Sequence, residues 1–299
     1  MNGDPVGLTG ATRLAGVIGD PVRHSLSPIL HNAAFRACGL DWAYLAFEVA
    51  AGSGGAAVAA MRTLDLGGLS VTMPHKGDVA AAVDRLSPVA RRLGAVNCVH
   101  WEGDDLVGEN TDGAGFLRSL AEDAGFEPKG RRCLVVGAGG AARAVVLGLR
   151  DAGAQDIVVV NRSAQRAGEA AALAGPVGRV AGPDAAGAAI GQADLIVNAT
   201  PIGMEGHTSQ GNRLPLDPGL IRPGRIVADL VYHPLRTLLL EAADSRGAVT
   251  VSGVGMLLHQ AGLAFELWTG QVAPITAMRE AMLGHVSARD DPEQGKREP

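Results

Sequence analysis

Aromatic side chains are scarce in this sequence: Phe, Trp and Tyr together make up 3% of its 299 residues. Cysteine is nearly absent as well, with three widely spaced residues. An odd number of separated cysteines argues against a disulfide framework or a zinc site and favours reduced thiols in the cytoplasm. The chain also lacks the run of about 18 apolar residues that a membrane helix needs. The sequence therefore predicts a soluble, cytoplasmic protein with no metal site.

Charge of one sign is not in excess either, since 26 basic residues stand against 31 acidic ones, for a net charge of −5. Without a basic run, binding to nucleic acid or to an anionic membrane is not supported. A chain of 299 residues with 47% hydrophobic content is expected to form about two globular domains. We expect a small-molecule partner, and a homodimer is compatible with the sequence.

A strand, a tight turn and a helix follow one another in the middle of the chain. The apolar residues 133–136 lead into Gly-Ala-Gly-Gly-Ala-Ala, and an Ala/Val/Leu helix then continues to about residue 149. Gly137 allows the turn, Gly139 lets the backbone approach a pyrophosphate, and small Ala142 keeps the helix close to the strand. A glycine turn also occurs without any ligand, so the residues at the end of the next strand are needed to tell a cofactor site from an ordinary turn.

That next strand, Asp156–Val160, ends at Asn161-Arg162-Ser163, where an NAD site usually has a carboxylate on the ribose. No acid here repels a 2′-phosphate, and Arg162 and Arg166 lie one helical turn apart, which favours NADP over NAD. The alternative is that both arginines solvate a helix face. The residues predicted to bind the cofactor are Gly137, Ala138, Gly139, Gly140, Ala141, Asn161, Arg162, Ser163 and Arg166.

The first part of the chain places polar residues beside strand ends. A strand at 14–18 precedes His-Ser-Leu-Ser-Pro, in which Ser27 is predicted to cap a helix with Pro28 at its first position. A strand at 42–47 and a helix come next, and then a strand at 68–72 runs into Met-Pro-His-Lys. Pro74 is expected to end that strand and start a helix. Ser25 and Ser27 are thus expected on a loop at the start of a helix, and Thr72 and Lys76 beside the carboxyl end of a strand, where α/β folds place their sites.

The rest of the chain alternates strands with helices. Residues 94–99 and a partner ending near 108 read as a hairpin, and Asn-Thr-Asp at 110 begins the helix that leads to the glycine turn. Strands at 177–180, 194–197, 226–229 and 249–251 predict a parallel, doubly wound sheet with right-handed crossovers. Helices at 256–268 and 276–286 follow, and the charged tail 287–299 is expected to be disordered.

Eight segments in order resemble the shikimate dehydrogenase family across nearly the whole chain. They are His-Ser-Leu-Ser-Pro at 24, Val-Thr-Met-Pro-His-Lys at 71, Gly-Ala-Val-Asn at 94, Asn-Thr-Asp-Gly at 110, Gly-Ala-Gly-Gly-Ala-Ala at 137, Asn-Arg-Ser at 161, Asn-Ala-Thr-Pro-Ile-Gly-Met at 198 and Met-Leu-Leu-His-Gln-Ala at 256. Two mild departures are Cys98 and Ser163, where the family usually or often has Thr.

This resemblance implies an α/β protein of two domains that interconverts 3-dehydroshikimate and shikimate with NADP. The predicted boundaries are residues 1–112 plus 254–299 for an α/β substrate domain and 113–253 for a Rossmann-type doubly wound sheet that binds NADP. The resemblance also adds Thr200, Gly253 and Met256 to the predicted cofactor site.

Reduction of a ketone needs a hydride donor and a proton donor that stabilises the developing alkoxide. Lys76 is the predicted catalytic acid, and Asp112 is predicted to hold Lys76 or to share its proton. A solvating lysine and a plain helix cap are the alternatives for these two residues. The polar side chains that suit a small hydroxylated carboxylate, with Tyr232 reaching the carboxylate, are Ser25, Ser27, Thr72, Asn97, Asp112, Tyr232 and Gln260. Gln260 can also be read as a core amide bonded to backbone, and Tyr232 as a half-buried side chain.

Two other functions stay open at this point. One is a quinate or aminoshikimate dehydrogenase. Relatives that act on quinate with NAD tend to have Thr in place of the second serine and to lose the Asn-Arg pair, so Ser27 and Arg162 argue against it. The other is a non-catalytic NADP-binding sensor on the same fold, which has little reason to keep Lys76 together with Asp112.

Overall fold

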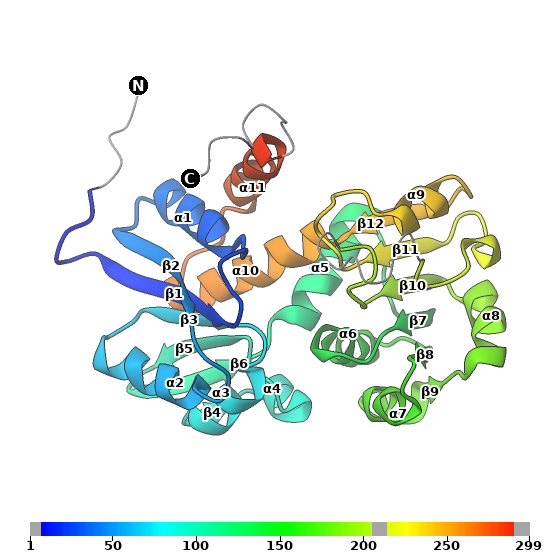
Figure 1. Ribbon diagram of the computed structural model, residues 1–299, viewed down its shortest axis with the longest axis horizontal. Coiled ribbons are helices and arrows are strands. Elements are labelled where there is room, and N and C mark those ends of the chain that lie inside the picture. The colour runs from blue at the N-terminus through cyan, green and yellow to red at the C-terminus, as the bar shows by residue number, and fades with distance from the viewer. Residues whose placement is uncertain (1–6, 205–213, 290–299) are drawn as a thin grey trace. The chain divides into compact units, whose positions relative to one another are not determined.

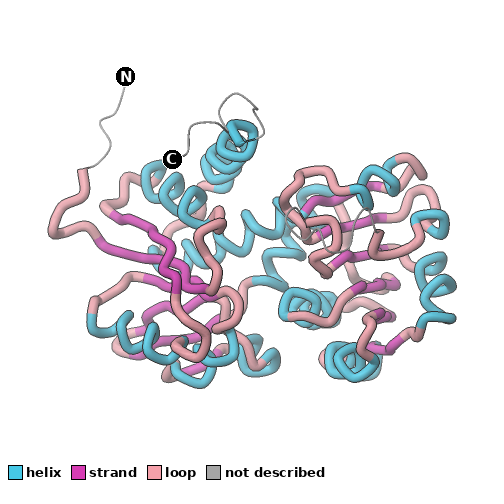
Figure 2. Tube along the Cα trace, viewed as in Figure 1, coloured by secondary structure: helices cyan, strands magenta, loops and turns pink. Residues whose placement is uncertain are grey.

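The structure, a computed structural model, describes residues 7–204 and 214–289, and Figure 1 shows its elements. The chain divides into two compact units. The first unit is Met1–Thr111 with Ala261–Pro299, and the second is Asp112–Gln260. Each unit contains a six-stranded sheet, drawn in magenta in Figure 2. Within the described ranges, no helix is long and apolar enough to span a bilayer.

The sheet of the first unit is mixed, with the strand order β2-β1-β3-β5-β6-β4. Strands β1, β2 and β3 run parallel, β5 runs antiparallel to β3, and β6 runs antiparallel to β5. The ends of β1, β3 and β6 and the start of β5 therefore lie at one edge, which we call the carboxyl edge of the first sheet. The strands are β1 (Arg13–Gly19), β2 (Trp42–Glu48), β3 (Gly68–Val71), β4 (Arg85–Leu86), β5 (Cys98–Glu102) and β6 (Asp105–Glu109).

Helices cover both faces of this sheet. On one face Val58 and Met61 of α2 and Val79 of α3 pack on buried strand residues. On the other face the rings of Tyr44 and Trp268 lie 5.9 Å apart, so much of the small aromatic content of the chain gathers there. The helices of the first unit are α1 (Ser27–Ala37), α2 (Gly54–Thr63), α3 (Lys76–Ala82), α4 (Pro88–Leu93), the second half of α10 (Gly253–Thr269) and α11 (Ile275–Arg289).

The sheet of the second unit is entirely parallel, with the order β12-β11-β10-β7-β8-β9. This is the doubly wound order of dinucleotide-binding folds, in which the strand order reverses between β7 and β10. The predicted parallel, doubly wound sheet is thereby confirmed. Its strands are β7 (Arg132–Val136), β8 (Asp156–Val160), β9 (Gly178–Val180), β10 (Leu195–Asn198), β11 (Ile226–Asp229) and β12 (Val249–Ser252).

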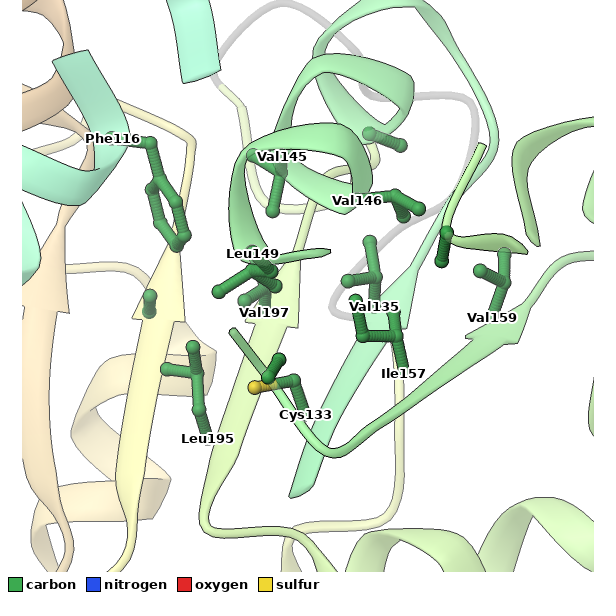
Figure 3. Packing of buried hydrophobic residues seen from close by; sticks show 14 of the residues in the cluster. Phe116, Cys133, Val135, Val145, Val146, Leu149, Ile157, Val159, Leu195 and Val197 are labelled. Atoms are coloured by element: carbon green, nitrogen blue, oxygen red, sulfur yellow. The ribbon is translucent and has the colours of Figure 1, made fainter. Parts of the chain in front are cut away.

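Alternate residues of the same strands pack on opposite layers of the second unit. Val135 and Val197 join a core with α5, α6 and α7, which Figure 3 shows from close by. Their neighbours Leu134 and Ile196 join a second core with α8 and α9. Strands buried on both faces explain why each reads as a continuous apolar run. The helices of this unit are α5 (Asp112–Ala124), α6 (Gly140–Asp151), α7 (Ala164–Ala172), α8 (Pro183–Gln192), α9 (Leu238–Asp244) and the first half of α10.

The start of α1 differs from the prediction. Ser27 is not the cap: Leu26 occupies that position without a side-chain bond, and Ser27 is the first helical residue. The reason is that the Ser25 hydroxyl already accepts from the Ser27 N–H at 3.2 Å, and Pro28 has no N–H to be capped. The Ser25 hydroxyl therefore provides the acceptor for the N–H of Ser27, the first residue of α1.

Other boundaries also differ, among them the start of α10, which is Gly253 where residue 256 was predicted. Residues 94–97 are not a strand, because Gly94 ends α4 in the left-handed conformation and β5 begins only at Cys98. Pro74 does not start a helix, since a turn closes from the His75 N–H to the Thr72 carbonyl and α3 begins at Lys76. The predicted disorder from 287 is wrong for 287–289, which continue α11, and 290–299 lie outside the described residues.

Candidate functional site

The carboxyl edge of the first sheet collects five of the residues predicted to act on a substrate. Ser25 and Ser27 follow β1, Thr72 and Lys76 follow β3, and Asn97 precedes β5. The register pairs Ile18 with Val71 and Ser70 with Cys98, so these three segments start from neighbouring positions of the sheet.

Backbone hydrogen bonds hold the segment that carries Lys76. The Thr72 N–H donates to the Ile18 carbonyl at 3.0 Å, and the Val96 N–H donates to the Lys76 carbonyl at 2.9 Å. Lys76 itself is half-buried as the first residue of α3. The segment is thus anchored by main-chain bonds at Thr72 and at Lys76, which fixes where the lysine side chain begins.

His75, which precedes the lysine, is a residue whose role sequence reasoning missed. Its imidazole is fully buried, and Nε2 lies 2.8 Å from the Val49 carbonyl oxygen, so Nε2 carries the proton and donates. This bond ties the Lys76 segment to the chain that follows β2. A buried histidine beside the lysine was the available signal, but its partner lies 26 residues away.

The segment that carries Ser25 and Ser27 lies beside a tyrosine that the sequence did not single out. The Tyr44 side chain is fully buried next to the hydroxyls of Ser70 and Ser27. Burial raises the pKa of the Tyr44 phenol, and the two hydroxyls lower it. Ser27 is 8% exposed and Ser25 is half-buried, so the second serine is the more enclosed of the pair.

The Asn97 amide bonds to Thr111 in the structure, and its contact with substrate stays a prediction. Its Oδ1 accepts from the Thr111 N–H at 2.8 Å, and its Nδ2 donates to the Thr111 hydroxyl at 3.0 Å. Asn97 is 5% exposed. Asp112, which follows Thr111 in the chain, is the first residue of α5 and is 7% exposed. Asn97 therefore fixes the position of the chain at the point where α5 starts.

In the second unit the glycine turn after β7 has the conformation that the motif predicts. Gly137 has φ of +116°, and a Cβ there would lie 2.8 Å from the Ala199 carbonyl. Gly139 and Gly140 are exposed, and a Cβ on either would meet nothing within 4 Å. Ala138 and Ala141 are half-buried, and Ala142 is fully buried in the core. The open N-terminus of α6 fits a pyrophosphate.

The chain after β8 carries two exposed arginines. Ser163 caps α7 by accepting from the Arg166 N–H at 3.3 Å, and the Asn161 amide donates to the Ser163 carbonyl at 3.2 Å. Arg162 and Arg166 are both exposed, and neither forms an ion pair with any residue in the described part of the chain. Their charges are therefore available to a phosphate, which fits NADP.

The remaining predicted residues follow the other strands of this sheet. Thr200, Tyr232 and Gly253 come after β10, β11 and β12, at the same edge as the glycine turn. Tyr232 is half-buried, and burial raises its pKa. On α10, Met256 is 9% exposed within the core, and the Gln260 amide donates to the Leu257 carbonyl at 3.0 Å.

Sequence reasoning also missed a buried polar group at this edge. Asn198 and Asp229, the last residues of β10 and β11, are 0% and 1% exposed and hydrogen-bonded to each other. Their position at the end of apolar strands was the signal. Across 7–204 and 214–289, no group of three or more His, Cys, Asp or Glu side chains is placed to hold a metal ion.

Family models match three stretches of the chain. The shikimate dehydrogenase substrate binding domain matches residues 17–99, shikimate / quinate 5-dehydrogenase matches 119–204, and the shikimate 5'-dehydrogenase C-terminal domain matches 253–283. The chain is 47% identical to the shikimate dehydrogenase (NADP(+)) of Moorella thermoacetica over 91% of this chain and 94% of that protein.

Solved structures agree with these matches. A shikimate dehydrogenase in complex with NADP+ superimposes with a TM-score of 0.86 at 35% identity, over 95% of this chain and 99% of that one. The quinate dehydrogenase of Corynebacterium glutamicum, in complex with NAD, gives 0.84 at 32% identity, over 91% and 99%. The identity and coverage show that this chain belongs to the shikimate dehydrogenase family.

Proposed function

We propose that this chain is an NADP-dependent dehydrogenase that interconverts 3-dehydroshikimate and shikimate. One observation carries the proposal: the carboxyl edge of the first sheet gathers Lys76 with Thr72 and the serine pair, in the unit matched by the substrate binding domain. Two serine hydroxyls suit a carboxylate, and a half-buried ammonium suits a developing alkoxide.

The choice of cofactor follows from the second unit. Exposed Arg162 and Arg166 stand where an NAD site has a carboxylate, and the open turn at Gly139 admits a pyrophosphate. NADPH, when bound, supplies the hydride that reduces the ketone. A quinate dehydrogenase that uses NAD is the less favoured alternative, because relatives at 45–47% identity are named shikimate dehydrogenase (NADP(+)), whereas the quinate dehydrogenase structure is 32% identical.

Proton movement is assigned to Lys76. In the reducing direction its ammonium donates a proton to the oxygen of the ketone as negative charge develops there, and in the oxidising direction its amine accepts the hydroxyl proton. Asp112, enclosed at the start of α5, is proposed to accept a hydrogen bond from a ring hydroxyl of the substrate and to share the proton that Lys76 moves. Tyr232 is proposed to donate to the substrate carboxylate.

The proposal is tested by following absorbance at 340 nm while the purified protein is mixed with shikimate and NADP. We expect NADPH to accumulate in proportion to enzyme, and we expect the reverse reaction with 3-dehydroshikimate and NADPH. NADPH formation with quinate but none with shikimate would contradict the assignment.

We further propose that the enzyme works in the cytoplasm with its thiols reduced. Cys98 and Cys133 are buried and Cys38 is partly exposed, and all three are free. Persistent disulfides are typical of oxidising compartments, so three unpaired thiols are consistent with the cytoplasm. Cell fractionation with an antibody to the protein checks this, and recovery outside the cytoplasmic fraction would contradict it.

A further inference from the structure

Two neighbouring strands of the second sheet end in a joined pair of buried polar side chains. The register pairs Asn198 of β10 directly with Asp229 of β11. The Asn198 Nδ2 donates to the Asp229 Oδ1 at 2.8 Å, and the two residues are 0% and 1% exposed. Both residues stand where a loop leaves the sheet, so this bond joins the starting points of two loops.

The Asp229 carboxylate is held by hydrogen bonds alone. Its Oδ1 also accepts from the Val231 N–H at 3.1 Å, and its Oδ2 accepts from the Thr237 hydroxyl at 2.6 Å. No cationic side chain in the described part of the chain contacts it. Burial raises the pKa of Asp229, and these three hydrogen bonds lower it. A buried carboxylate without a cation is costly, so the donors around it have to be kept in place.

On one side, the network fixes the loop after β10 against the glycine turn. The Asn198 Oδ1 accepts from the Thr200 N–H at 3.1 Å and from the Thr200 hydroxyl at 2.7 Å, and its Nδ2 reaches the Ile202 carbonyl at 3.2 Å. A Cβ on Gly137 would meet the Ala199 carbonyl at 2.8 Å and the Thr200 methyl at 3.2 Å. This loop is therefore one wall of the turn assigned to the pyrophosphate.

On the other side, the network fixes both ends of the segment that carries Tyr232. Val231 at its start and Thr237 at its end both donate to the Asp229 carboxylate. The Thr237 hydroxyl also caps α9, accepting from the Leu240 N–H at 3.3 Å. The segment between them is thus closed on a single carboxylate, and Tyr232 lies inside it.

We propose that Asp229 is a positioning residue for both ligands: its carboxylate sets the Thr200 loop beside the cofactor turn and the segment that presents Tyr232 to the substrate. This inference rests on the function proposed above. An amide replaces the carboxylate poorly, because asparagine has one acceptor oxygen where Asp229 uses two, and its NH₂ can bond to Thr237 only if that hydroxyl turns to accept and gives up its own donated bond. Loss of the carboxylate therefore weakens NADP and shikimate together.

The test compares Asp229→Asn with the wild type. NADP affinity is measured by calorimetry without substrate, and the KM for shikimate and kcat are measured at saturating NADP. Loss of a hydrogen bond to a charged group predicts a rise of about 10-fold or more in both the NADP Kd and the shikimate KM, with a smaller change in kcat. A purely structural role would lower Tm and leave both constants at their wild-type values, and that result would overturn the proposal.

Variants of Thr237 test the Tyr232 side of the network separately from the cofactor side. They also keep the proposal testable if Asp229→Asn does not fold. Thr237→Val removes the hydroxyl that closes the Tyr232 segment, so the shikimate KM is expected to rise about 10-fold while the NADP Kd stays unchanged. Thr237→Ser keeps the hydroxyl and is expected to restore the wild-type KM. Equal KM values for the Val and Ser variants would overturn the proposal.

The same experiment distinguishes a failure of the proposed function. A wild-type protein that binds NADP but does not oxidise shikimate would contradict the function. The calorimetric comparison of Asp229→Asn with the wild type would still decide whether Asp229 positions the cofactor loop, because it needs no substrate.

Discussion

The two sheets bring their functional residues together in different ways. In the second unit all six strands are parallel, so every loop that follows a strand starts at one edge. In the first unit β5 runs antiparallel to both β3 and β6, so the carboxyl edge collects residues that follow β1 and β3 together with Asn97, which precedes β5. Strand direction decides whether a residue after or before a strand reaches the site.

The means of fixing the loops also differ. In the first unit main-chain bonds hold the Lys76 segment, and Asn97 and His75 hold neighbouring backbone. In the second unit one buried carboxylate, Asp229, accepts from the Asn198 side chain at the end of β10 and from Val231 and Thr237 of the chain after β11. The two units are therefore expected to differ in mutational behaviour: changes at the carboxyl edge of the first sheet should affect the substrate alone, and changes in the second unit should affect cofactor affinity or, at the Tyr232 segment, the substrate as well.

The largest expected effect is the loss of proton transfer in the first unit. Lys76→Ala should lower kcat by about 10² to 10⁴, the usual contribution of a general acid or base, and leave the NADP Kd unchanged. Stopped-flow turnover and calorimetry measure the two quantities. Lys129→Ala, at an exposed position of the second unit, is the control and should keep wild-type turnover. Near-normal kcat in Lys76→Ala would remove the lysine from the mechanism.

The next effect belongs to the second unit and should leave the first untouched. Arg162→Ala is expected to weaken NADP roughly 10- to 150-fold, the loss of a charged contact of about 1.5 to 3 kcal/mol, and to change NAD affinity much less. Fluorescence titration with both cofactors gives the ratio. The matched control is Arg150→Ala, an exposed arginine bound to Asp151. Parallel loss of NAD and NADP affinity would show that Arg162 does not read the 2′-phosphate.

A smaller effect is expected at the serine pair. Ser25→Ala and Ser27→Ala should each raise the shikimate KM about 10-fold with an unchanged NADP Kd, because each removes one donor to a charged carboxylate. Initial rates at saturating NADP measure this. Ser53→Ala is the control, since Ser53 precedes α2 without a side-chain cap bond. If the serine variants bind both shikimate and NADP more weakly, the assignment of Ser25 and Ser27 to substrate binding alone is wrong.

The smallest effect concerns the interior of the first unit. Burial lowers the pKa of His31, which stacks on Tyr44, to about 3, from an ordinary value of 6.5. The unfolded chain therefore binds a proton below pH 6.5 that the folded chain refuses, and the free energy of unfolding falls by about 1.4 kcal/mol per pH unit from this group as the pH drops from 6.5 towards 3.

His31→Phe keeps a ring in the stack and should abolish that part of the acid loss. Urea unfolding at pH 7.5 and pH 5.5 measures it, with His285→Phe on α11 as the control. If His31→Phe and the wild type lost the same stability between the two pH values, a buried neutral imidazole would be contradicted.

The sequence predicts the second unit more completely than the first. Apolar strand runs and the glycine turn are local signals, and strands 156–160 and 226–229 have the predicted limits. Where prediction failed, the cause was a neighbouring group. The Ser25 hydroxyl accepts from the start of α1 in place of Ser27, and Gly94 ends α4 in the left-handed conformation, so that β5 begins only at Cys98.

The residues that orient the site were harder still to predict. Asp229 reads as the last residue of an apolar strand, and its bond to Asn198 spans 31 positions of the chain. His75 likewise depends on a carbonyl 26 positions away. Such contacts follow from strand order, which local patterns do not contain. Local sequence patterns therefore point to candidate ligand-binding residues, but they do not reveal the residues that hold those candidates in place.

The most direct test of the account is the specificity matrix of the wild-type enzyme, with shikimate and quinate each assayed with NADP and with NAD at 340 nm. The account predicts that kcat/KM is highest for shikimate with NADP, and that replacing NADP by NAD or shikimate by quinate lowers it at least about 10-fold, the cost of roughly 1.4 kcal/mol of lost binding. A higher kcat/KM for quinate with NAD would contradict both the substrate assigned to the first unit and the cofactor assigned to the second.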